Sequence, residues 1–525
     1  DATWLAIGAS IFASNIGSEH LIGLAGAGAS SGMAMAHWEI QGWMILILGW
    51  VFVPFYTRSM VYTMPEFLER RYNPQSRTIL SVISLVSYVL TKVAVTVYAG
   101  GLVFQQVFGI KELWGIDFFW IAAIGLVVLT ALYTIFGGMK SVLYTSVLQT
   151  PILLLGSLII LVLGFKELGG WDEMMRVCGA VTVNDYGDTM TNLIRSNDDA
   201  NFPWLGALIG SAIIGFWYWC TDQFIVQRVL SGKNEMEARR GTIFGAYLKL
   251  LPVFLFLIPG MIAFALHQKY IGAGGEGFLP MLANGTANAD AAFPTLVDKL
   301  LPAGVKGLVV CGILAALMSS LASLFNSSAM LFTIDFYKRF RPETPEKKLV
   351  GIGQVATVVI VILGILWIPI MRSVGDVLYT YLQDVQSVLA PGIAAAFLLG
   401  ICWKRTSAQG GMWGLIAGMV IGLTRLGAKV YYSNAGEVAD STFKYLFYDM
   451  NWLFFCGWMF LFCIIVVIVV SLATKAPTAE KIQGLVFGTA TKEQKAATRA
   501  SWNHWDIIHT VIILAITGAF YWYFW

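Results

Sequence analysis

Near the start of the chain, an apolar segment is interrupted by the stretch Gly8-Ala9-Ser10-Ile11-Phe12-Ala13-Ser14-Asn15-Ile16-Gly17-Ser18-Glu19-His20. The stretch brings glycines, hydroxyls, an amide, a carboxylate and an imidazole into what would otherwise be a membrane-spanning helix. Backbone at membrane depth leaves the helix only where protein or a water-filled cavity satisfies its amides and carbonyls. Such broken helices form the binding sites of transporters. The stretch therefore predicts a polar ligand site inside a membrane and indicates transport.

The composition of the chain is that of a membrane protein. Of its 525 residues, 57% are hydrophobic and 12% are charged, and the mean hydropathy is +0.71. Soluble domains carry about 25% charged residues. Residues 152–165, 355–370 and 459–472 are almost unbroken apolar runs, which favours helices over the alternating strands of a barrel. We therefore predict an all-α polytopic membrane protein whose surroundings are the lipid bilayer of the cell membrane, either a plasma or an inner membrane.

The apolar runs predict about thirteen membrane spans, centred within residues 4–31, 38–56, 79–108, 118–136, 142–165, 204–229, 242–266, 307–332, 349–370, 377–403, 412–426, 452–472 and 505–525. Positive charges in the loops indicate the orientation, because cytoplasmic loops are enriched in lysine and arginine. The loop of residues 166–203 carries seven acids against three bases and should lie outside. The first span begins a few residues into the chain, so we expect a further segment upstream. The basic residues that define the cytoplasmic side are Arg58, Arg70, Arg71, Arg77, Arg228, Lys233, Arg239, Arg240, Lys338, Arg339, Arg341, Lys347 and Lys348.

Other functional classes have little support in the sequence. A net charge of +3 is too small to indicate nucleic-acid binding. The five histidines show no zinc-ligand spacing, no glycine-rich phosphate loop precedes a helix, and no nucleophile stands out beside a base. We therefore expect neither an enzyme with catalytic residues nor a nucleic-acid partner. The sequence leaves the oligomeric state open.

A second apolar segment, residues 210–223, is interrupted in the same way, by the sequence GSAIIGFWYWCTDQ. Spans one and six would then be corresponding broken helices of two five-span halves. Inverted repeats of this kind place substrate and ion at their shared interface and alternate access by moving one part against the other. We predict a transporter core over residues 1–405, with halves at about 4–167 and 204–403, and peripheral C-terminal helices over residues 406–525.

Five motifs, in this order along the chain, resemble the sodium/solute symporter family, and specifically its sodium-glucose cotransporter branch. They are residues 8–28, YTMPEFL at 62–68, WYWCTDQ at 217–223, YLKLLP at 247–252 and SSLASLFNS at 319–327. The resemblance runs from about residue 4 through 405 and continues more loosely to 525. It implies a LeuT-type inverted-repeat core of five plus five helices, with additional C-terminal helices, that carries a sugar inward with sodium. The family usually has one further helix before the first span, which agrees with the abrupt start.

The resemblance also implies a sugar site. A hexose has hydroxyls around a ring with apolar faces, so its site needs hydrogen-bonding groups and aromatic surfaces. Two kinds of gate are implied as well, an inner ring at Tyr218 and an outer hydrophobic lid at Tyr379 and Leu24. The residues that match the family's sugar contacts are Asn15, His20, Glu39, Lys249 and Gln383, with Trp219 as an aromatic neighbour.

Taken without the resemblance, these residues have simpler interpretations. Glu39 and Lys249 could be a buried structural ion pair, although intramembrane charges are functional by default. His20 alone could be a packing histidine. Tyr218 and Tyr379, like Trp219, would more often be core aromatics or interface anchors than gates. The convergence of all of them on one family pattern favours the binding site.

A sodium site is implied on the same basis. Sodium prefers neutral oxygens, which unwound carbonyls and helix hydroxyls provide, although serine pairs in membrane helices often only hydrogen-bond within or between helices. We expect sodium to bridge spans one and eight, to hold the outward-open state and to pre-form the sugar site, so that each ligand strengthens binding of the other. The implied ligands are Ala13 and Ile16 on span one, and Ala316 (carbonyl), Ser319 and Ser320 on span eight.

Two departures from the family pattern affect these expectations. The family commonly has an aspartate where this chain has Ser146, and that carboxylate goes with a second sodium site in some members. Ser323 remains, but without the charge we predict Na⁺ as the coupling ion at one per sugar. Gly42 and Gly215 stand where the family often has polar side chains, so we expect a roomier pocket there.

The substrate is open at this point. The pair Glu19 and His20 is shared with polyol-carrying relatives, so myo-inositol or a pentose competes with a glucose- or galactose-like hexose. A carrier of an amino acid, nucleobase or carboxylic acid remains an alternative, although Glu39 and Lys249 can balance each other, which favours a neutral solute. A sodium- and sugar-binding sensor or leak channel without coupled transport is the other alternative.

Overall fold

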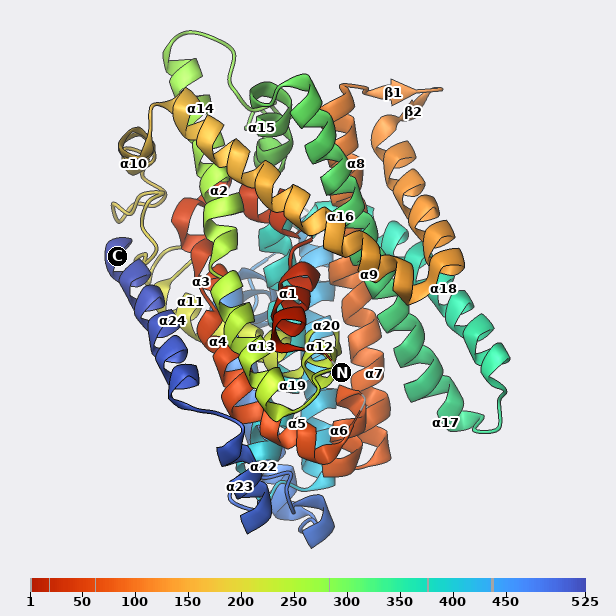
Figure 1. Cartoon of the computed structure of the whole chain (residues 1–525). Helices are drawn as coiled ribbons and strands as arrows, with labels where there is room; N and C mark the ends of the chain where they lie inside the picture. Colours follow the sequence, from red (N-terminus) through yellow and green to blue (C-terminus); the bar gives the residue numbers. More distant parts are fainter. Residues whose placement is uncertain (1, 18, 62, 283, 375–376, 436–438) are drawn as a thin grey trace.

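Helices make up most of the structure, which is a computed structural model (Figure 1). It describes residues 2–17, 19–61, 63–282, 284–374, 377–435 and 439–525, without the side chains of residues 133–150, 326 and 372–374. Within these residues, eleven helical segments are long and apolar enough to cross a membrane, and two shorter apolar stretches, Trp4–Asn15 and Phe118–Leu132, are helical as well. The predicted all-α polytopic architecture is confirmed.

In the first part of the chain, helices run up to residue 179 with one small hairpin between them. The strands β1 (Glu112–Leu113) and β2 (Ile116–Asp117) pair antiparallel, with Glu112 opposite Asp117. The helices are α1 (Trp4–Asn15), η1 (Glu19–Leu24), α2 (Ala25–Ser31), η2 (Gly32–Met35), α3 (Ala36–Glu39), α4 (Gly42–Ile47), η3 (Leu48–Phe52), α5 (Val53–Ser59), α6 (Met64–Arg71), α7 (Pro74–Ser87), η4 (Tyr88–Val93), α8 (Ala94–Phe108), α9 (Phe118–Leu168) and α10 (Trp171–Gly179).

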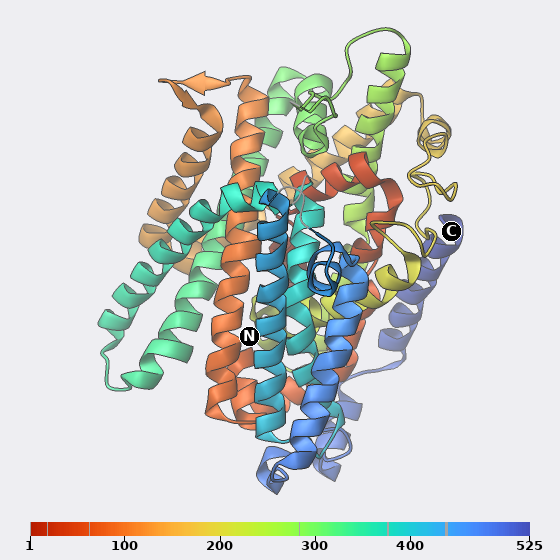
Figure 2. The same ribbon diagram turned by 180° about the vertical axis from the view of Figure 1, so that it is seen from behind.

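The second part of the chain is also helical. Its helix α19 lies deep in the bundle and packs against α20 and α22, which stand beside it in Figure 2. The helices are α11 (Trp204–Gly215), η5 (Phe216–Thr221), α12 (Gln223–Leu230), α13 (Glu235–Leu248), η6 (Val253–Leu257), α14 (Ile258–Gly272), η7 (Ala289–Ala291), α15 (Ala292–Leu300), α16 (Ala303–Met330), η8 (Leu331–Tyr337), α17 (Lys338–Phe340), α18 (Glu346–Val374), α19 (Leu378–Cys402), α20 (Ala408–Asn434), α21 (Thr442–Lys444), η9 (Tyr445–Asp449), α22 (Trp452–Ala473), η10 (Ala479–Lys481), α23 (Lys492–Ala500) and α24 (His504–Tyr523).

Spans one and six are both broken, as the two polar interruptions predict. Helix α1 ends at Asn15, and Ile16 is extended with φ −80° and ψ 105°. In the sixth span, Asp222 is extended with φ −76° and ψ 128°, and its side chain accepts a hydrogen bond from the Phe224 amide to begin α12. An aspartate at an N-cap satisfies an amide that the helix itself cannot pair. The polar residues therefore end one helix and start the next.

The boundaries of several predicted spans differ from the structure. Two spans expected at 118–136 and 142–165 belong to one continuous helix, α9, whose 51 residues would extend about 77 Å at 1.5 Å per residue. This exceeds the roughly 30 Å of a bilayer core, and Figure 1 shows the ribbon of α9 changing direction along its length. Similarly, one helical run covers Glu19–Ser59. Gly32 interrupts it with φ +67°, a conformation that favours glycine.

Close backbone packing fixes η1 and α2 against α14. A Cβ built on Gly260 would overlap the Ala25 carbonyl, and one built on Gly28 would overlap the Leu257 carbonyl. Small residues let membrane helices approach to this distance. The contact places η1, which precedes α2, against η6, which follows α13.

The start of α19 is held by a buried carboxylate in η7. Both oxygens of Asp290 lie 3.2 Å from the Leu378 amide nitrogen, which donates to them. The same side chain fills the space beside Gly26 on α2. Burial raises the pKa of Asp290 to about 7. Asp290 therefore joins the beginning of α19 to the second half of span one.

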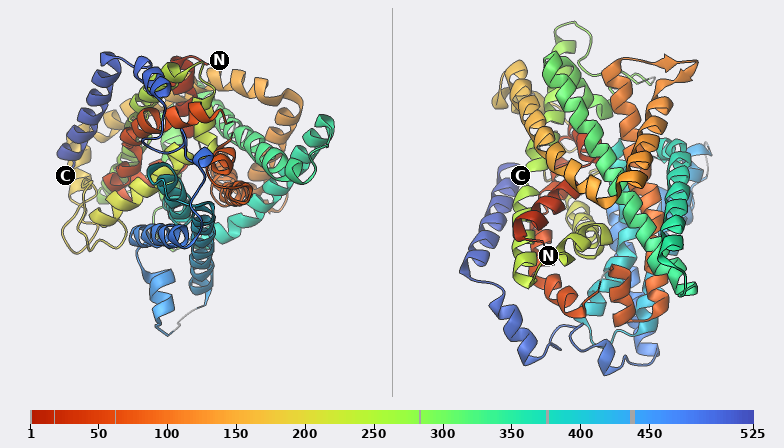
Figure 3. Two further views of the ribbon diagram at one scale, coloured as in Figure 1. Left: turned by 90° about the horizontal axis from the view of Figure 1, so that it is seen from below. Right: turned by 45° about the vertical axis from the view of Figure 1, so that its right-hand side comes forward.

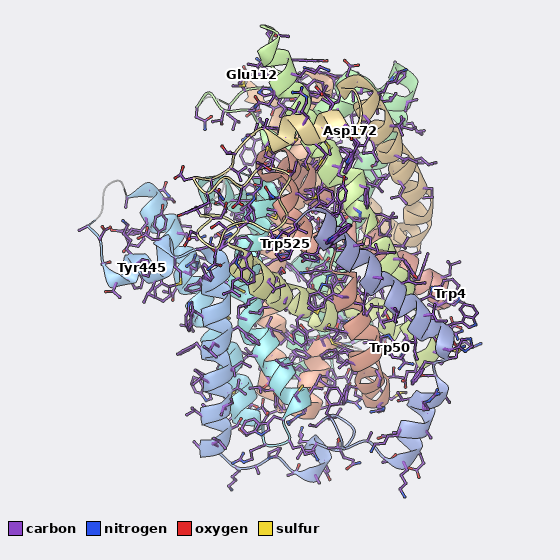
Figure 4. All side chains as sticks on the ribbon, turned by 90° about the vertical axis from the view of Figure 1, so that its left-hand side faces the viewer. Trp4, Trp50, Glu112, Asp172, Tyr445 and Trp525 are labelled. Carbon is purple, nitrogen blue, oxygen red and sulfur yellow. The ribbon has the colours of Figure 1, made fainter. Side chains whose placement is uncertain are left out.

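Helix α24, near the end of the chain, lies on the outside of the bundle (Figure 3). Seen from below in Figure 3, α24 and α18 lie on opposite sides. Helix α24 contacts α4 and α13, and near its end the Leu193 amide donates to the Phe524 carbonyl over 2.8 Å. Figure 4 shows Tyr445 on η9 projecting to one side of the bundle and Trp525 beside the loops that precede α11. The last helix thus reaches the predicted outer loop at 166–203.

Helix α23 and the first turn of α24 contact two of the predicted cytoplasmic basic clusters. Arg58 donates to the Thr498 hydroxyl over 2.7 Å, and Arg240 pairs with Asp506 at 3.0 Å. Figure 1 shows α6, α17 and α23 at one end of the molecule and α10, β1 and β2 at the other. The basic loops therefore gather at one end, and the positive-inside rule makes that end cytoplasmic.

The packing of α2 on α14 gives a first prediction. We expect Gly260→Ala to lower the melting temperature of the detergent-purified protein, because the added methyl forces two helices apart. Overpacking of this kind costs about 1–3 kcal/mol. Gly272→Ala, at the end of the same helix, is the matched control, since nothing lies within 4 Å of a Cβ there. Equal melting temperatures for the two variants would contradict the close contact.

Candidate functional site

A buried carboxylate, Glu39 at the end of α3, lies at the centre of the candidate site. Lys249, which follows α13, donates from Nζ to its Oε2 over 2.6 Å, and the Tyr379 hydroxyl on α19 donates to its Oε1 over 2.5 Å. Nε2 of His20 on η1 lies 3.3 Å from Oε2. Glu39 is 0% exposed and Lys249 is 4% exposed. Four distant parts of the chain therefore meet at one paired carboxylate, whose contacts are strengthened by the low local dielectric.

The breaks in spans one and six face each other beside this carboxylate. Asn15 is the last residue of α1, and its Oδ1 accepts from the Tyr218 hydroxyl over 3.3 Å. Its Nδ2 lies 3.3 Å from Nε2 of His20. The rings of Tyr218 and Trp219 meet edge to face, with centroids 4.9 Å apart. The Lys249 ammonium lies 5.3 Å from the Trp219 ring centroid.

These side chains surround a cavity of about 40 Å³. Eight of the nine predicted substrate and gate residues line it. Ligand sites for small molecules typically hold roughly 300–1,000 Å³, so the cavity is too small for a ring-sized ligand in this conformation and its walls would have to separate to admit one. The lining residues are Asn15, Glu19, His20, Trp38, Glu39, Gln41, Ile214, Gly215, Tyr218, Trp219, Lys249, Tyr379, Leu382, Gln383 and Gln386.

Leu24, the ninth predicted residue, does not line this cavity. It ends η1 and is fully buried in the core. Its neighbour Gly23 packs against α19 instead, since a Cβ there would lie 3.1 Å from the Tyr379 Cβ. Tyr379 therefore packs against the backbone of η1, and the Leu24 side chain lies apart from the cavity.

A second charged pair lies beyond Tyr218. Lys92 on η4 is buried, with its Nζ 3.9 Å from Oδ2 of Asp222 at the break of span six. The ammonium lies 3.6 Å from the Phe224 ring centroid and 4.9 Å from that of Tyr218. The Tyr88 hydroxyl donates to the other Asp222 oxygen over 3.1 Å. The Lys92 ammonium thus joins Asp222 at the break of span six to the ring of Tyr218.

The predicted sodium residues come from two segments that meet at Gly17. Ala13 lies in the last turn of α1 and Ile16 directly follows it, where carbonyls lack intrahelical partners. A Cβ at Gly17 would lie 3.0 Å from Oγ of Ser320 on α16. Ser319 precedes Ser320, and Ala316 stands one turn earlier on the same helix. The side chain of Ser146 lies outside the described residues.

The expected room at Gly42 and Gly215 is filled by other parts of the protein. A Cβ at Gly42 would lie 2.9 Å from the Ala246 carbonyl and 3.3 Å from Ile513 on α24. A Cβ at Gly215 would overlap the amide of Gln41. The prediction of a roomier pocket is therefore wrong, because neighbouring segments move into the space that the missing side chains leave.

Two amides of the cavity wall, Gln386 and Gln41, are not among the residues predicted from the sequence. Gln386 stands three residues after Gln383 on α19, so helical spacing puts both on one face and could have predicted it. Gln41 lies between α3 and α4 with φ −80° and ψ 27°. No regular period places its side chain, so only the tertiary structure locates it.

The chemistry of the cavity suits a neutral hydrogen-bonding ligand. Among the described residues, no group of three His, Cys, Asp or Glu could hold a metal ion. Four carboxamides line the wall, at Asn15, Gln41, Gln383 and Gln386, and an amide both donates and accepts. Oε1 of Gln383 has no hydrogen-bond partner within the described part of the chain.

Known proteins with similar sequences are cotransporters. The chain is 36% identical over 502 residues to the "Sodium/myo-inositol cotransporter 2" of Homo sapiens, which covers 93% of this chain and 73% of that protein. It is 39% identical over 490 residues to the "Sodium/glucose cotransporter 1" of Ovis aries, covering 90% and 73% respectively. The two relatives match most of the chain and differ in the substrate that they are named for.

A solved structure and a family model also match most of this chain. The structure described as "Substrate-bound outward-open state of a Na+-coupled sialic acid symporter reveals a novel Na+-site" has a TM-score of 0.67 at 22% identity, over 91% of each chain. This likeness shows the fold, which is the expected LeuT-type fold. The family model described as "Sodium:solute symporter family" matches residues 1–418. The chain is therefore an integral membrane protein that belongs to the sodium:solute symporter family.

Proposed function

We propose that this symporter imports a neutral sugar, a glucose- or galactose-like hexose, together with sodium by alternating access. The observation that carries the proposal is the wall of carboxamides around the paired charges of Glu39 and Lys249. An acidic solute would need an uncompensated positive charge, whereas Lys249 is balanced by Glu39 and the wall holds a second carboxylate, Glu19. Hydroxyls of a sugar can donate to the carboxylate and accept from the ammonium. Trp219 offers an aromatic surface for the apolar face of the ring.

Myo-inositol, or another polyol, is the second candidate. It presents hydroxyls to the same amides, and relatives named for myo-inositol and for glucose are similarly close to this chain. The substrate set of the first experiment therefore includes both.

The proposed cycle assigns roles to the two sides of the cavity. Sugar enters from the side of Tyr379 and Gln383 when α19 moves away from η1, which breaks the hydrogen bond between Tyr379 and Glu39. It leaves toward the basic end when Tyr218 separates from Asn15. Sodium held between Ala13 and Ile16 on one side and Ala316, Ser319 and Ser320 on the other would fix the break of span one, and so the position of Asn15 and His20. Sodium and sugar then strengthen each other's binding.

The first experiment measures uptake of radiolabelled glucose, galactose and myo-inositol into proteoliposomes, with sodium or potassium outside. We expect at least one solute to accumulate only with sodium. Gln383→Ala and Ser319→Ala should each lower that uptake about tenfold or more. The first removes a hydrogen-bonding group from the proposed sugar site, and the second removes an oxygen from the proposed sodium site. Gln354→Ala on the exposed face of α18 and Ser327→Ala, whose hydroxyl donates to the Ser323 carbonyl of its own helix, are the matched controls.

A sensor without transport predicts a different result. In that case sodium and sugar would still raise the melting temperature of the purified protein, but no solute would accumulate against a gradient. If sodium raises the melting temperature but no sugar or polyol does, the proposed substrate is wrong and only the proposed sodium site is supported.

The ion pair of Glu39 and Lys249 distinguishes a binding role from a structural one. Lys249→Met leaves a buried carboxylate without its ammonium, so we expect a lower melting temperature, since breaking a buried pair costs about 3–5 kcal/mol. The double variant Glu39→Gln with Lys249→Met removes both charges and should recover most of the melting temperature. Its sodium-driven uptake should stay low. Normal uptake by the double variant would make the pair purely structural.

The coupling ratio is expected to be one sodium per sugar. A second cation in a low-dielectric site needs a compensating charge, and Ser146 supplies none. Parallel uptake of labelled sodium and labelled sugar into voltage-clamped proteoliposomes measures the ratio directly. A ratio of two to one would contradict the prediction, and Ser146→Asp is the variant expected to raise the ratio.

A further inference from the structure

Gln41 occupies an unusual place in the cavity wall. It lies in the bend between α3 and α4, two residues after Glu39, and is 2% exposed. Its Nε2 donates to the Ser211 carbonyl on α11 over 2.7 Å. This hydrogen bond runs from span two to span six and holds the amide at the cavity.

Gly215 is the complement of this amide. A Cβ at position 215 would overlap Oε1 of Gln41 and would lie 2.9 Å from its Cδ and 3.1 Å from its Nε2. The whole amide therefore packs against the Gly215 backbone. Any side chain at position 215 would displace the amide of Gln41. Span six offers no polar group at this point of the wall, so the polar group comes from span two.

The chemistry of the held amide indicates what it recognises. One N–H of Nε2 is used by Ser211, which leaves one N–H and the Oε1 lone pairs for a ligand. A hydroxyl satisfies both, because it accepts and donates, whereas a ring ether oxygen or a carboxylate only accepts. A ligand that lacks the matching hydroxyl leaves the buried amide without a hydrogen-bond partner. The site therefore rejects that ligand more strongly than an apolar wall would.

We propose that Gln41 is a specificity-determining residue that hydrogen-bonds one hydroxyl of the substrate, and that Gly215 is the positioning residue that lets it do so. The inference rests on the proposed function, since it assigns a contact within the same cavity. It adds a residue that the sequence resemblance did not supply. It also explains why the glycine at 215 does not enlarge the pocket.

The test uses the best transported solute and its set of single-deoxy analogues. For the unaltered protein, one analogue should show a kcat/KM about 5- to 100-fold below the parent, the range expected when one buried hydrogen bond is lost. In Gln41→Ala the kcat/KM for the parent solute should fall by a similar factor. The ratio of parent to that one analogue should approach one, with the ratios for the other positions unchanged. Loss of structure alone would lower kcat/KM for all solutes together and leave every ratio unchanged.

A double-variant cycle separates the two residues. Gly215→Ala should reproduce the altered ratio, because its methyl displaces the amide. Adding Gly215→Ala to Gln41→Ala should change little further, since the methyl then has room. If Gly215→Ala does not fold, the deoxy series on Gln41→Ala decides the matter by itself. Additive effects in the cycle would overturn the positioning role of Gly215.

Failure of this inference and failure of the proposed function give different results. If the unaltered protein transports a sugar or polyol with sodium but Gln41→Ala keeps every deoxy ratio, only the inference falls. If a solute is bound without transport, the same ratios taken from its dissociation constants decide the role of Gln41. If no neutral polyhydroxylated solute is bound or transported, both fall. Sodium-induced thermal protection should be equal in all variants, since none touches α16.

Discussion

A fully buried carboxylate inside a membrane protein persists only when its charge and its oxygens are matched, and the site depends on how Glu39 meets this condition. Its partners Lys249, Tyr379 and His20 come from three other segments. Their convergence sets where spans one, two, seven and ten meet. A movement of α19 that separates Tyr379 from Glu39 removes one hydrogen-bond donor from the carboxylate that Lys249 and His20 also contact. In the proposed cycle, the electrostatics of the pair thereby couple the wall of the cavity at Tyr379 to its centre.

The two breaks in the helices serve this centre in different ways. The break of span one presents Asn15 and His20 to the cavity and brings Gly17 against Ser320 of α16. The break of span six places Tyr218 at the cavity and Asp222 beyond it, near Lys92. In the proposed cycle, an ion at the first break therefore acts on the same residues that contact the sugar. Unwound backbone makes this arrangement possible, because it exposes polar groups at membrane depth only where protein covers them.

Much of the fold and site could be predicted from local sequence. Glycines and polar residues within apolar runs predicted both breaks, and eight of the nine residues matched to the sugar site and gates line one cavity. The errors arose where a distant segment decides the outcome. Hydropathy could not show that α9 continues through two expected spans, and the resemblance could not show that Leu24 is buried apart from the cavity. The room expected at Gly215 is taken by Gln41, a contact that no spacing in the chain encodes.

The sequence by itself determined residence in the membrane, the two interrupted spans and membership of the symporter family, since hydrophobic length and motif order are properties of short stretches. The tertiary structure decided which buried groups are paired, how small the closed cavity is, and that Gln41 of span two supplies a polar group at span six. Those features depend on short contacts between segments far apart in the chain, such as the 2.7 Å from Gln41 to Ser211 and the 2.6 Å from Lys249 to Glu39. Close packing between helices, rather than local propensity, sets such distances.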